Sequence, residues 1–247
     1  MNFKSFNFHP KVAAGVTAME YVTPTPIQEQ AIPTVLKNHD VMGMAQTGTG
    51  KTAAFVLPIL NRLIENRDAG VRALILAPTR ELAEQINDAI RALGHKTHLR
   101  STTVYGGVNI NPQIQKLKRT DIVVACPGRL LDHIGRNTID LSKLEVLVLD
   151  EADLMFDMGF FPDIRRILKH LPKNRQTLLF SATMPTEIRR MAGEILRNPT
   201  TVQVGTTAPA ETVSHALYPV AQHLKTKLLV KLLKTGLKMI LGSSKKY

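Results

Sequence analysis

Short apolar runs alternate along this chain with longer segments in which apolar residues recur at helical spacing. The runs rich in β-forming residues are 40–44, 73–77, 102–105, 121–126, 146–150, 177–180 and 201–204. Helical periodicity covers 51–66, 80–93, 162–170 and 186–197. Apolar strands separated by helices indicate a parallel sheet with helices on both faces. The chain is therefore predicted to be an α/β protein that binds ligands beyond the carboxyl ends of its strands.

Composition and charge narrow the class of protein further. Of the 247 residues 44% are hydrophobic and 21% charged, which is enough apolar material for a sizeable core. The formal net charge of +12 favours a polyanionic partner such as nucleic acid, although a basic surface without such a partner stays open. The single cysteine, Cys126, excludes an internal disulfide and a multi-cysteine metal site. Without a long apolar run or a signal core, we expect a cytoplasmic protein with no membrane partner.

The stretch MAQTGTGKTAAF follows the run 40–44 and opens a helical segment. It fits a phosphate-binding loop with Ala45 at the first glycine position, followed by Gly50, Lys51 and Thr52. Gly48 and Gly50 would let the backbone wrap around phosphates with its N–H groups pointing inward, at the N-terminus of the helix. Lys51 is expected to reach the β- and γ-phosphates, and the Thr52 hydroxyl to bind Mg²⁺. A flexible turn with an incidental lysine is the alternative.

The stretch LEVLVLDEADLMFDMGF ends an apolar run in three carboxylates, Asp150, Glu151 and Asp153. Clustered carboxylates repel one another and are costly to desolvate, so a positive group is expected beside them. Asp150 would hold the Mg²⁺ bound to ATP through water, and Glu151 would orient and deprotonate the attacking water. A solvated turn is the alternative, and the phosphate loop makes it less favoured.

Together the motifs resemble those of the DEAD-box RNA helicases of superfamily two. The motifs, in the family's order, are PTPIQ at 24–28, AQTGTGKT at 45–52, PTRELA at 78–83, the glycine pair 106–107, CPGR at 126–129, DEAD at 150–153 and SAT at 181–183. The resemblance covers about residues 3 to 225 and is closest to bacterial members with a minimal helicase core. It implies a RecA-like domain of the P-loop NTPase class, with ATP and Mg²⁺ as cofactors and RNA as substrate.

The resemblance also implies a role for each matching position of the nucleotide site. Gln28 would contact the adenine edge through both amide atoms, Tyr21 would stack on the ring, and Phe3 matches the family's isolated upstream aromatic. The phosphates would be bound by Ala45, Gln46, Thr47, Gly48, Thr49, Gly50, Lys51 and Thr52, with Thr52 and Asp150 at the metal. The residues implied in catalysis are Lys51, Asp150, Glu151, Ser181 and Thr183. The last two would couple nucleotide state to RNA binding, partly by holding Asp153.

A second set of positions would hold one RNA strand by its phosphates and sugars. These positions are Pro78, Thr79, Arg80, Gly107, Pro127, Gly128 and Arg129. Guanidinium groups and free N–H groups suit this task because they bind phosphate without reading bases. Ordinary surface arginines and turn glycines are the alternative.

Two positions depart from the family pattern. Cys126 replaces the usual threonine, which either weakens one contact near the RNA or places a small residue in the interior. Glu20 stands where the Q motif begins with glycine and is expected to affect only a helix end. His95 and His98 lie close together without a further ligand pattern and are assigned to solvent.

Three regions are expected along the chain: a RecA-like domain at 1–205 with the Q motif within 1–29, a linker at 206–221, and a basic segment at 222–247. The basic segment holds seven lysines and no acidic residue, and 226–234 resembles the first helix of the family's second domain. The match ends at 235–247, so that second domain, with the arginines that reach the γ-phosphate, is expected to be essentially missing. We therefore expect a monomer that binds ATP·Mg²⁺, hydrolyses it slowly and needs a second helicase domain for full activity.

Other classes of function stay open from the sequence. One is a DNA-dependent ATPase of the same superfamily, against which the Q motif argues. A second is a non-catalytic, nucleotide-gated module that binds RNA or a protein partner. The least favoured is a membrane-active basic helix in HLKTKLLVKLLK, whose lysines are better explained as the exposed face of an ordinary helix.

Overall fold

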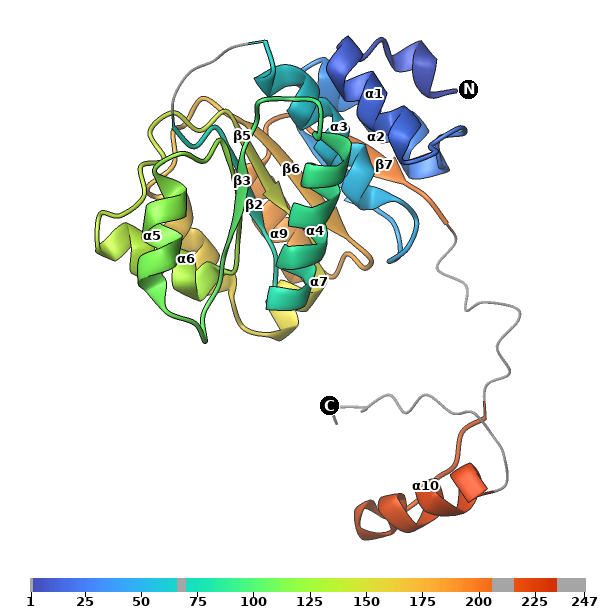
Figure 1. Cartoon of the computed structure of the whole chain (residues 1–247). Coiled ribbons are helices and arrows are strands. Elements are labelled where there is room, and N and C mark those ends of the chain that lie inside the picture. The colour runs from blue at the N-terminus through green and yellow to red at the C-terminus, as the bar shows by residue number, and fades with distance from the viewer. Residues whose placement is uncertain (1, 66–69, 206–215, 235–247) are drawn as a thin grey trace. The chain divides into compact units, whose positions relative to one another are not determined.

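The computed structural model describes residues 2–65, 70–205 and 216–234 (Figure 1). The chain forms two compact units, residues 1–205 and 206–247, and each is considered by itself. Positions 206–215 of the expected linker, the segment 235–247 and the end of the helix expected at 51–66 lie outside the described residues. Within the described residues, no helix is both long and apolar enough to cross a bilayer.

The first unit is built on a parallel sheet of seven strands, as predicted. The strands are β1 (Val41–Met44), β2 (Ala73–Leu76), β3 (Ser101–Val104), β4 (Ile122–Ala125), β5 (Val146–Leu149), β6 (Gln176–Ser181) and β7 (Thr200–Gln203). Their order across the sheet is β3-β4-β2-β5-β6-β1-β7, and every neighbouring pair is parallel. Each predicted run agrees with its strand to within one residue at either end, because fully buried strands leave an unbroken apolar signature.

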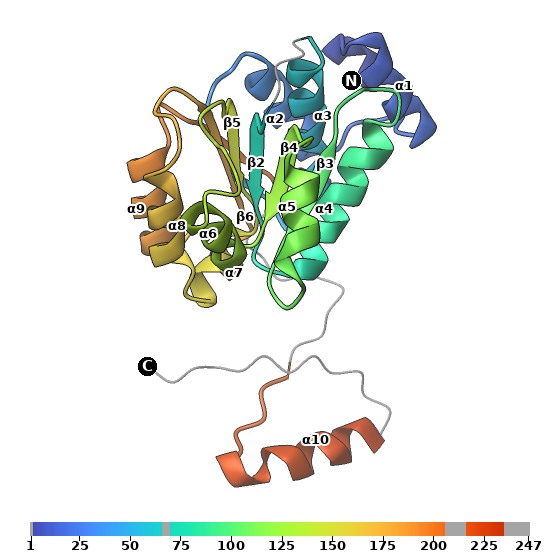
Figure 2. The same cartoon turned by 60° about the vertical axis from the view of Figure 1, so that its left-hand side comes forward.

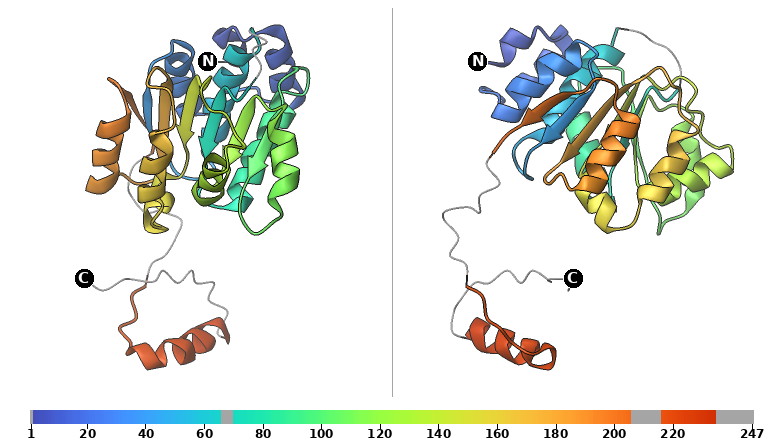
Figure 3. Two further views of the ribbon diagram at one scale, coloured as in Figure 1. Left: turned by 90° about the vertical axis from the view of Figure 1, so that its left-hand side faces the viewer. Right: turned by 180° about the vertical axis from the view of Figure 1, so that it is seen from behind.

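Helices cover both faces of this sheet. One face carries α1 (Pro10–Ala18), α2 (Pro26–Leu36), α3 (Lys51–Leu63) and α4 (Arg80–Leu93), with the short 3-10 helix η1 (Phe3–Phe6) beside them. The other face carries α5 (Ile110–Leu117), α6 (Pro127–Gly135), α7 (Ala152–Asp157), α8 (Phe161–Leu168) and α9 (Thr186–Ile195). The right-hand view of Figure 3, turned by 180° from Figure 1, shows this second layer toward the viewer, with α8 in yellow and α9 in orange.

The strands supply both cores because successive side chains point to opposite faces. Ile75 packs with the core under α1 to α4, whereas Leu74 packs with the core under α5 to α9. Both residues are fully buried, and the same alternation holds in β4 and β5. This two-sided burial requires continuous apolar strands and holds the loops at the carboxyl edge in place.

The described part of the second unit consists of the 3-10 helix η2 (Gln222–Leu224) and α10 (Lys225–Lys234). Lys225, Lys227 and Lys231 are exposed, while Leu232 is 9% exposed. A helix was expected here at 226–234, and its start one residue earlier is within the usual uncertainty of helix ends. Its role, as the start of a further domain or as a membrane-binding helix, stays a prediction.

Candidate functional site

All the motif residues lie at or near one edge of the sheet, where the parallel strands end. The phosphate loop follows β1, the carboxylates follow β5, and Ser181 ends β6. The expected RNA contacts follow β2, β3 and β4. Since the strand order is β3-β4-β2-β5-β6-β1-β7, these segments separate into two adjoining halves of the same edge. The nucleotide half and the RNA half meet between β2 and β5.

The phosphate loop is a tight turn that leads directly into α3. Gly48 and Gly50 have positive φ angles of 82° and 94°, which favour glycine. A Cβ atom on Gly50 would also lie 2.5 Å from Gln28 Nε2, so a side chain here would displace the Gln28 amide. The Ala45 N–H donates to the Ser181 carbonyl at 3.1 Å, which ties the start of the loop to the end of β6. The loop therefore opens a helix N-terminus with its backbone N–H groups available for an anion.

Lys51, the first residue of α3, joins the loop to the carboxylates at the end of β5. Its Nζ lies 2.9 Å from Glu151 Oε1, and the two side chains are only 5% and 12% exposed. Glu151 itself has a left-handed φ of 54° between β5 and α7. Such a conformation is uncommon for a residue other than glycine, and strained backbone of this kind is frequent at functional sites. The ion pair places a cation and a carboxylate beside the phosphate loop.

Asp150 is a carboxylate buried to 2% exposure beside this pair. Burial raises the pKa of Asp150 to about 7, although the nearby Lys51 charge lowers it in part. Its Oδ1 accepts the Glu151 N–H at 3.1 Å. A divalent cation would offset the cost of this buried charge, and Mg²⁺ commonly uses one or two protein oxygens together with substrate phosphates. Asp150 and the hydroxyl of Thr52 therefore fit a Mg²⁺–nucleotide complex, whereas the described residues contain no cluster of three or more metal-ligating side chains.

Asp153 joins the carboxylate segment to the end of β6. Its Oδ2 accepts the N–H and the hydroxyl of Thr183 at 2.9 and 3.0 Å, and its own N–H donates to Ser181 Oγ at 3.1 Å. Burial raises the pKa of Asp153, but the hydrogen bonds from Thr183 and Ser181 and from the backbone together hold the pKa below its ordinary value. The predicted partners are therefore in contact, and Asp153 stays ionised at neutral pH.

Gln28 binds the phosphate loop directly. The side chain is 4% exposed, its Nε2 donates to the Gly50 carbonyl at 3.1 Å, and its Oε1 accepts the Thr25 N–H at 2.9 Å. The bond from Thr25 is the Gln28 half of a capping box at the start of α2. One amide hydrogen and one lone pair remain for a ligand, because each amide atom forms two bonds. The expected contact with adenine is thus compatible with the position of Gln28 and stays a prediction.

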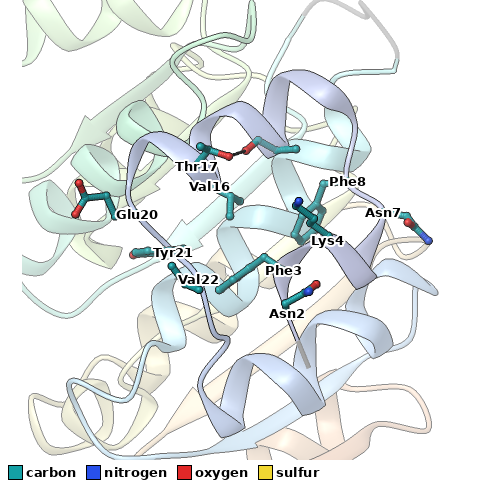
Figure 4. A pocket seen from close by; sticks show the side chains of 11 residues that line it. Asn2, Phe3, Lys4, Asn7, Phe8, Val16, Thr17, Glu20, Tyr21 and Val22 are labelled. Atoms are coloured by element: carbon teal, nitrogen blue, oxygen red, sulfur yellow. Dashed lines mark hydrogen bonds between the residues drawn. The ribbon is translucent and has the colours of Figure 1, made fainter.

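Phe3 and Tyr21 line a hollow of about 620 Å³ formed by η1, α1 and the segment that follows α1 (Figure 4). The two ring centroids lie 5.6 Å apart with their planes tilted by 34°. Phe3 is 6% exposed and also packs against Phe6 at 5.8 Å. None of the phosphate-loop residues lines this hollow. The packing shows that Phe3 supports the ring of Tyr21, while adenine stacking on Tyr21 stays a prediction.

In the RNA half, two helix N-termini lie near an exposed glycine turn. Thr79 caps α4 by accepting the Leu82 N–H at 3.2 Å, and the exposed Arg80 begins that helix. Pro127, Gly128 and Arg129 begin α6, and Gly107 has a φ of 79° in the turn after β3. Arg129 Nη1 donates to the Val108 carbonyl at 2.9 Å, which links α6 to that turn. Pro78 is buried in the turn before α4 and offers little surface to a ligand.

The structure adds two residues that the motifs did not assign, Tyr105 and Glu84. The Arg80 guanidinium lies over the Tyr105 ring, 4.8 Å from its centroid, and the Tyr105 hydroxyl donates to Glu84 Oε1 at 2.6 Å. Tyr105 could have been found from the sequence, because it directly precedes the glycine pair 106–107. No sequence pattern marked Glu84, since the contact joins α4 to the end of β3.

The departures from the family pattern also have places in the structure. Cys126 is half-buried against the core under α1 to α4 and provides no side-chain cap for α6. Glu20 occupies a left-handed position after α1, with a φ of 56°. His95 and His98 are exposed, as expected.

Comparison with known proteins identifies relatives along most of the chain. Residues 25–191 match the family model described as DEAD/DEAH box helicase. The chain is 49% identical over 203 residues to the ATP-dependent RNA helicase CshA of Listeria monocytogenes, covering 82% of this chain and 39% of that protein. It is 42% identical over 236 residues to the DEAD-box ATP-dependent RNA helicase RhpA of Helicobacter pylori, covering 95% of this chain and 48% of that protein.

Solved structures agree with this result. A DEAD box protein from the hyperthermophile Methanococcus jannaschii superposes with a TM-score of 0.80 at 37% sequence identity, over 95% of this chain and 63% of that chain. The predicted RecA-like fold is thereby confirmed. The chain spans less than half the length of the two curated relatives.

Proposed function

The chain belongs to the DEAD/DEAH box helicase family, as its motifs predicted, and we propose that it forms the ATP-binding and RNA-binding half of an ATP-dependent RNA helicase. The observation that carries this proposal is the pairing of Lys51 with Glu151 at 2.9 Å, next to the buried Asp150 and beside the phosphate loop. A loop for phosphates, a cation, a metal-binding carboxylate and a second carboxylate within reach of water are together the parts of a nucleotide hydrolysis site.

ATP would bind with its phosphates in the loop 45–52 and its adenine near Gln28 and Tyr21. When ATP binds, the Lys51 ammonium group would leave Glu151 and pair with phosphate oxygens, since its side chain can reach either anionic partner. That exchange would free the Glu151 carboxylate to accept a proton from the attacking water. Thr52 and Asp150 would hold Mg²⁺, which when bound neutralises charge on the phosphates.

The contact of Asp153 with Ser181 and Thr183 would couple the nucleotide half to the rest of the protein. Asp153 lies two residues from Glu151, at the start of the same helix, so a movement of Glu151 would reach Asp153 through one short turn. Thr79, Arg80, Gly107, Gly128 and Arg129 would bind one RNA strand through phosphate and sugar contacts, without base specificity. The intact protein would close two domains on that strand and separate short duplexes locally, in the cytoplasm.

We propose that this 247-residue chain by itself binds ATP·Mg²⁺ but hydrolyses it slowly. Among the described residues, no arginine side chain is bonded to the phosphate loop, Asp150 or Glu151. An arginine at the transferred phosphate contributes about 10³ to 10⁵ in rate. The runner-up function is a non-catalytic, nucleotide-gated module, in which Glu151→Gln would leave the activity unaltered.

The test is steady-state ATP hydrolysis with and without single-stranded RNA, beside fluorescence measurements of nucleotide affinity. The chain should bind nucleotide with little turnover, and Lys51→Ala should weaken binding at least about tenfold through loss of a charged phosphate contact. RNA-stimulated turnover that Lys51→Ala abolishes would instead mean that the chain completes its catalytic site by itself, and slow hydrolysis would be wrong. Failure to bind nucleotide at all would refute the proposed function.

Single-stranded DNA of the same length is the control for the nucleic-acid class. Equal stimulation by DNA and RNA, or equal binding of both, would favour the DNA-dependent alternative. Preference for RNA would support an RNA helicase.

A further inference from the structure

A groove of about 590 Å³ runs along β3, the outermost strand on one side of the sheet. Among the described residues, no further strand pairs with its free side. Its floor is formed by Ser101, Thr102 and Thr103. One wall is α4, and the other is the end of α5 with the residues that follow it. Figure 2 shows α4 and α5 near this edge strand, on opposite faces of the sheet. None of the site residues predicted from the motifs lines this groove.

The groove is strongly basic. Arg91 lines it from α4, Lys116 and Arg119 line it from the other wall, and Arg100 lines it from the position before β3; all four side chains are exposed. None of the four side chains forms an ion pair with any residue that the structure describes. Four uncompensated cations around one hollow favour an anionic ligand with more than one charge.

The single carboxylate that lines the groove is already engaged. Glu84 Oε1 accepts the hydroxyl groups of Tyr105 at 2.6 Å and Thr103 at 3.1 Å. Its two bonds hold the carboxylate against the end of β3, on the side of the groove nearest the glycine turn. It therefore orients Tyr105 and is not paired with any of the four cations. Asp121 accepts the Arg100 N–H at 2.8 Å but forms no ion pair with the Arg100 side chain.

Two buried acceptors in the groove lack donors. Asn87 is 6% exposed, lines the groove from α4, and its Oδ1 has no hydrogen-bond partner within the described structure. Ser101 Oγ, on the floor, is likewise buried and without a partner among the described residues. Buried polar atoms are nearly always hydrogen-bonded, so these two atoms are open to a bond from water or from a ligand. A ligand that carries both negative charges and hydroxyl donors meets both requirements, and the backbone of RNA is such a ligand because each 2′-OH can donate.

The groove also continues the RNA half of the edge described above. Tyr105 lines its end, the Arg80 guanidinium lies over the Tyr105 ring at 4.8 Å, and Gly106 and Gly107 follow directly. A strand held at Arg80 would therefore lie next to Tyr105, which lines the groove. We propose that the groove beside β3 is a second RNA-binding site, which takes the phosphate backbone of the strand beyond the segment held by the family motifs. This inference rests on the proposed function.

An acidic peptide added as a further strand to β3 is the competing occupant. Recognition of this kind depends on pockets for alternate side chains. Leu99 is the one aliphatic side chain that lines the groove, and the other lining groups are polar, charged or tyrosine. This lining therefore favours a phosphate backbone over a peptide.

The test compares oligouridylates of about six and about twelve nucleotides, a range that single-strand sites commonly span. The groove variant is Arg91→Glu with Lys116→Glu, which reverses one cation on each wall. The matched control is Arg189→Glu with Lys169→Glu, an exposed arginine on α9 and an exposed lysine that follows α8. Both pairs of substitutions change the net charge equally. Circular dichroism and the affinity for an ATP analogue show whether each variant is folded.

In the unmutated chain the longer RNA should bind more tightly than the shorter one. The groove variant should lose this gain, with about tenfold weaker binding of the longer RNA and a salt slope reduced by about 1.4, that is about 0.7 for each of two contacts. Binding of the shorter RNA, and both affinities of the control variant, should change by less than about twofold. A DNA oligonucleotide as long as the longer RNA should gain less binding affinity from its extra nucleotides than the RNA does, because DNA lacks the 2′-OH.

The outcomes separate the two proposals. The unmutated chain and the groove variant could bind the longer RNA with equal affinity while the shorter RNA is also bound. That result would overturn the groove proposal and leave the proposed function standing. Equal losses in the groove and control variants would also overturn it, since the effect would then be one of net charge. A fluorescent acidic peptide that the groove variant fails to bind, with RNA affinity unchanged, would assign the groove to a peptide. No binding of either RNA would refute both proposals.

Discussion

Glu20 ends α1 in a backbone conformation that glycine adopts more easily than glutamate. Its φ is 56°, its N–H donates to the Thr17 carbonyl, and the Tyr21 N–H donates back to the Val16 carbonyl at 3.1 Å. This pair of bonds is a Schellman motif, in which the residue at the left-handed position is usually glycine. The departure at Glu20 thus affects the helix end, and it also determines where the chain turns toward Tyr21.

We expect Glu20→Gly to raise the free energy of unfolding by about 1 kcal/mol, since it relieves a left-handed conformation without removing a contact. Urea denaturation of the chain measures this change. Glu20→Ala is the control, because alanine keeps the Cβ and should bring little gain. Equal stabilisation by both substitutions would show that the glutamate charge, and not its backbone, is the cause.

Cys126 should be slow to react with thiol reagents. Burial raises the pKa of its thiol to about 11, with a smaller contribution from Glu81. Only the thiolate reacts, and a pKa about two units above the ordinary value leaves about a hundredfold less thiolate near pH 8. Alkylation of the folded chain should therefore be about a hundredfold slower than that of the urea-unfolded chain, and should rise with pH up to about 11. Rapid labelling of the folded chain at pH 8 would contradict this account.

At the scale of elements, α1 lies unusually close to the end of α4. A Cβ atom on Gly15 would lie 1.8 Å from the Leu93 carbonyl oxygen, so no other residue fits without movement of the helix. Through this contact α1 carries Val16 to the hollow that Phe3 and Tyr21 line. The aromatic part of the expected adenine site therefore depends on the packing of α1 against the end of α4.

Gly15→Ala should lower the free energy of unfolding by roughly 1–3 kcal/mol, the usual cost of overpacking. Gly193→Ala is the matched control, because Gly193 is exposed inside α9 and a Cβ there would meet nothing within 4 Å. That control should gain about 0.5–1 kcal/mol from helix propensity. Thermal or urea unfolding compares the two, and a gain at both positions would mean that α1 is not held as closely as the structure places it.

At the scale of the whole molecule, the amino ends of the strands are joined by Arg72. Its side chain is 1% exposed, and its Nη2 donates to the Leu63 carbonyl at 2.8 Å. Carboxylate oxygens of Asp121 and Glu145 lie 3.8 and 3.7 Å from its guanidinium nitrogens. One buried arginine thereby connects the end of α3 with the starts of β4 and β5, at the opposite edge of the sheet from the functional site.

Arg72→Ala should cost about 3 kcal/mol or more, because it leaves a cavity, removes the donor to the Leu63 carbonyl and takes the Arg72 charge away from Asp121, whereas Glu145 keeps its bond to Arg62. Arg72→Met keeps most of the volume and should cost less. Arg165→Ala is the control, since that arginine pairs with Glu194 on the surface and should cost less than about 1 kcal/mol. Denaturation midpoints of the three variants test the ranking, and similar losses for Arg72→Ala and Arg165→Ala would show that the buried network is not important for stability.

At the carboxyl edge of the sheet, the functional segments lie in an order that differs from their order along the chain. Segments that bind nucleotide in our proposal follow β1, β5 and β6, and segments that bind RNA follow β2, β3 and β4. The strand order places the two groups side by side rather than interleaved. Asp153 and Thr183, thirty residues apart, come into contact at this edge for the same reason.

The sequence by itself determined the parallel sheet, its strands to within one residue, the phosphate loop and the family, because each of these depends on short-range patterns. Continuous apolar strands, a Gly-rich turn before a helix and a motif of a few residues are all visible without knowing which segments meet. The tertiary structure alone decided which distant residues meet: Gln28 with Gly50, Arg80 with Tyr105, Arg72 with its carboxylates, and the cations of the groove beside β3. These contacts follow from strand order and helix packing, and no periodic pattern in the sequence specifies either.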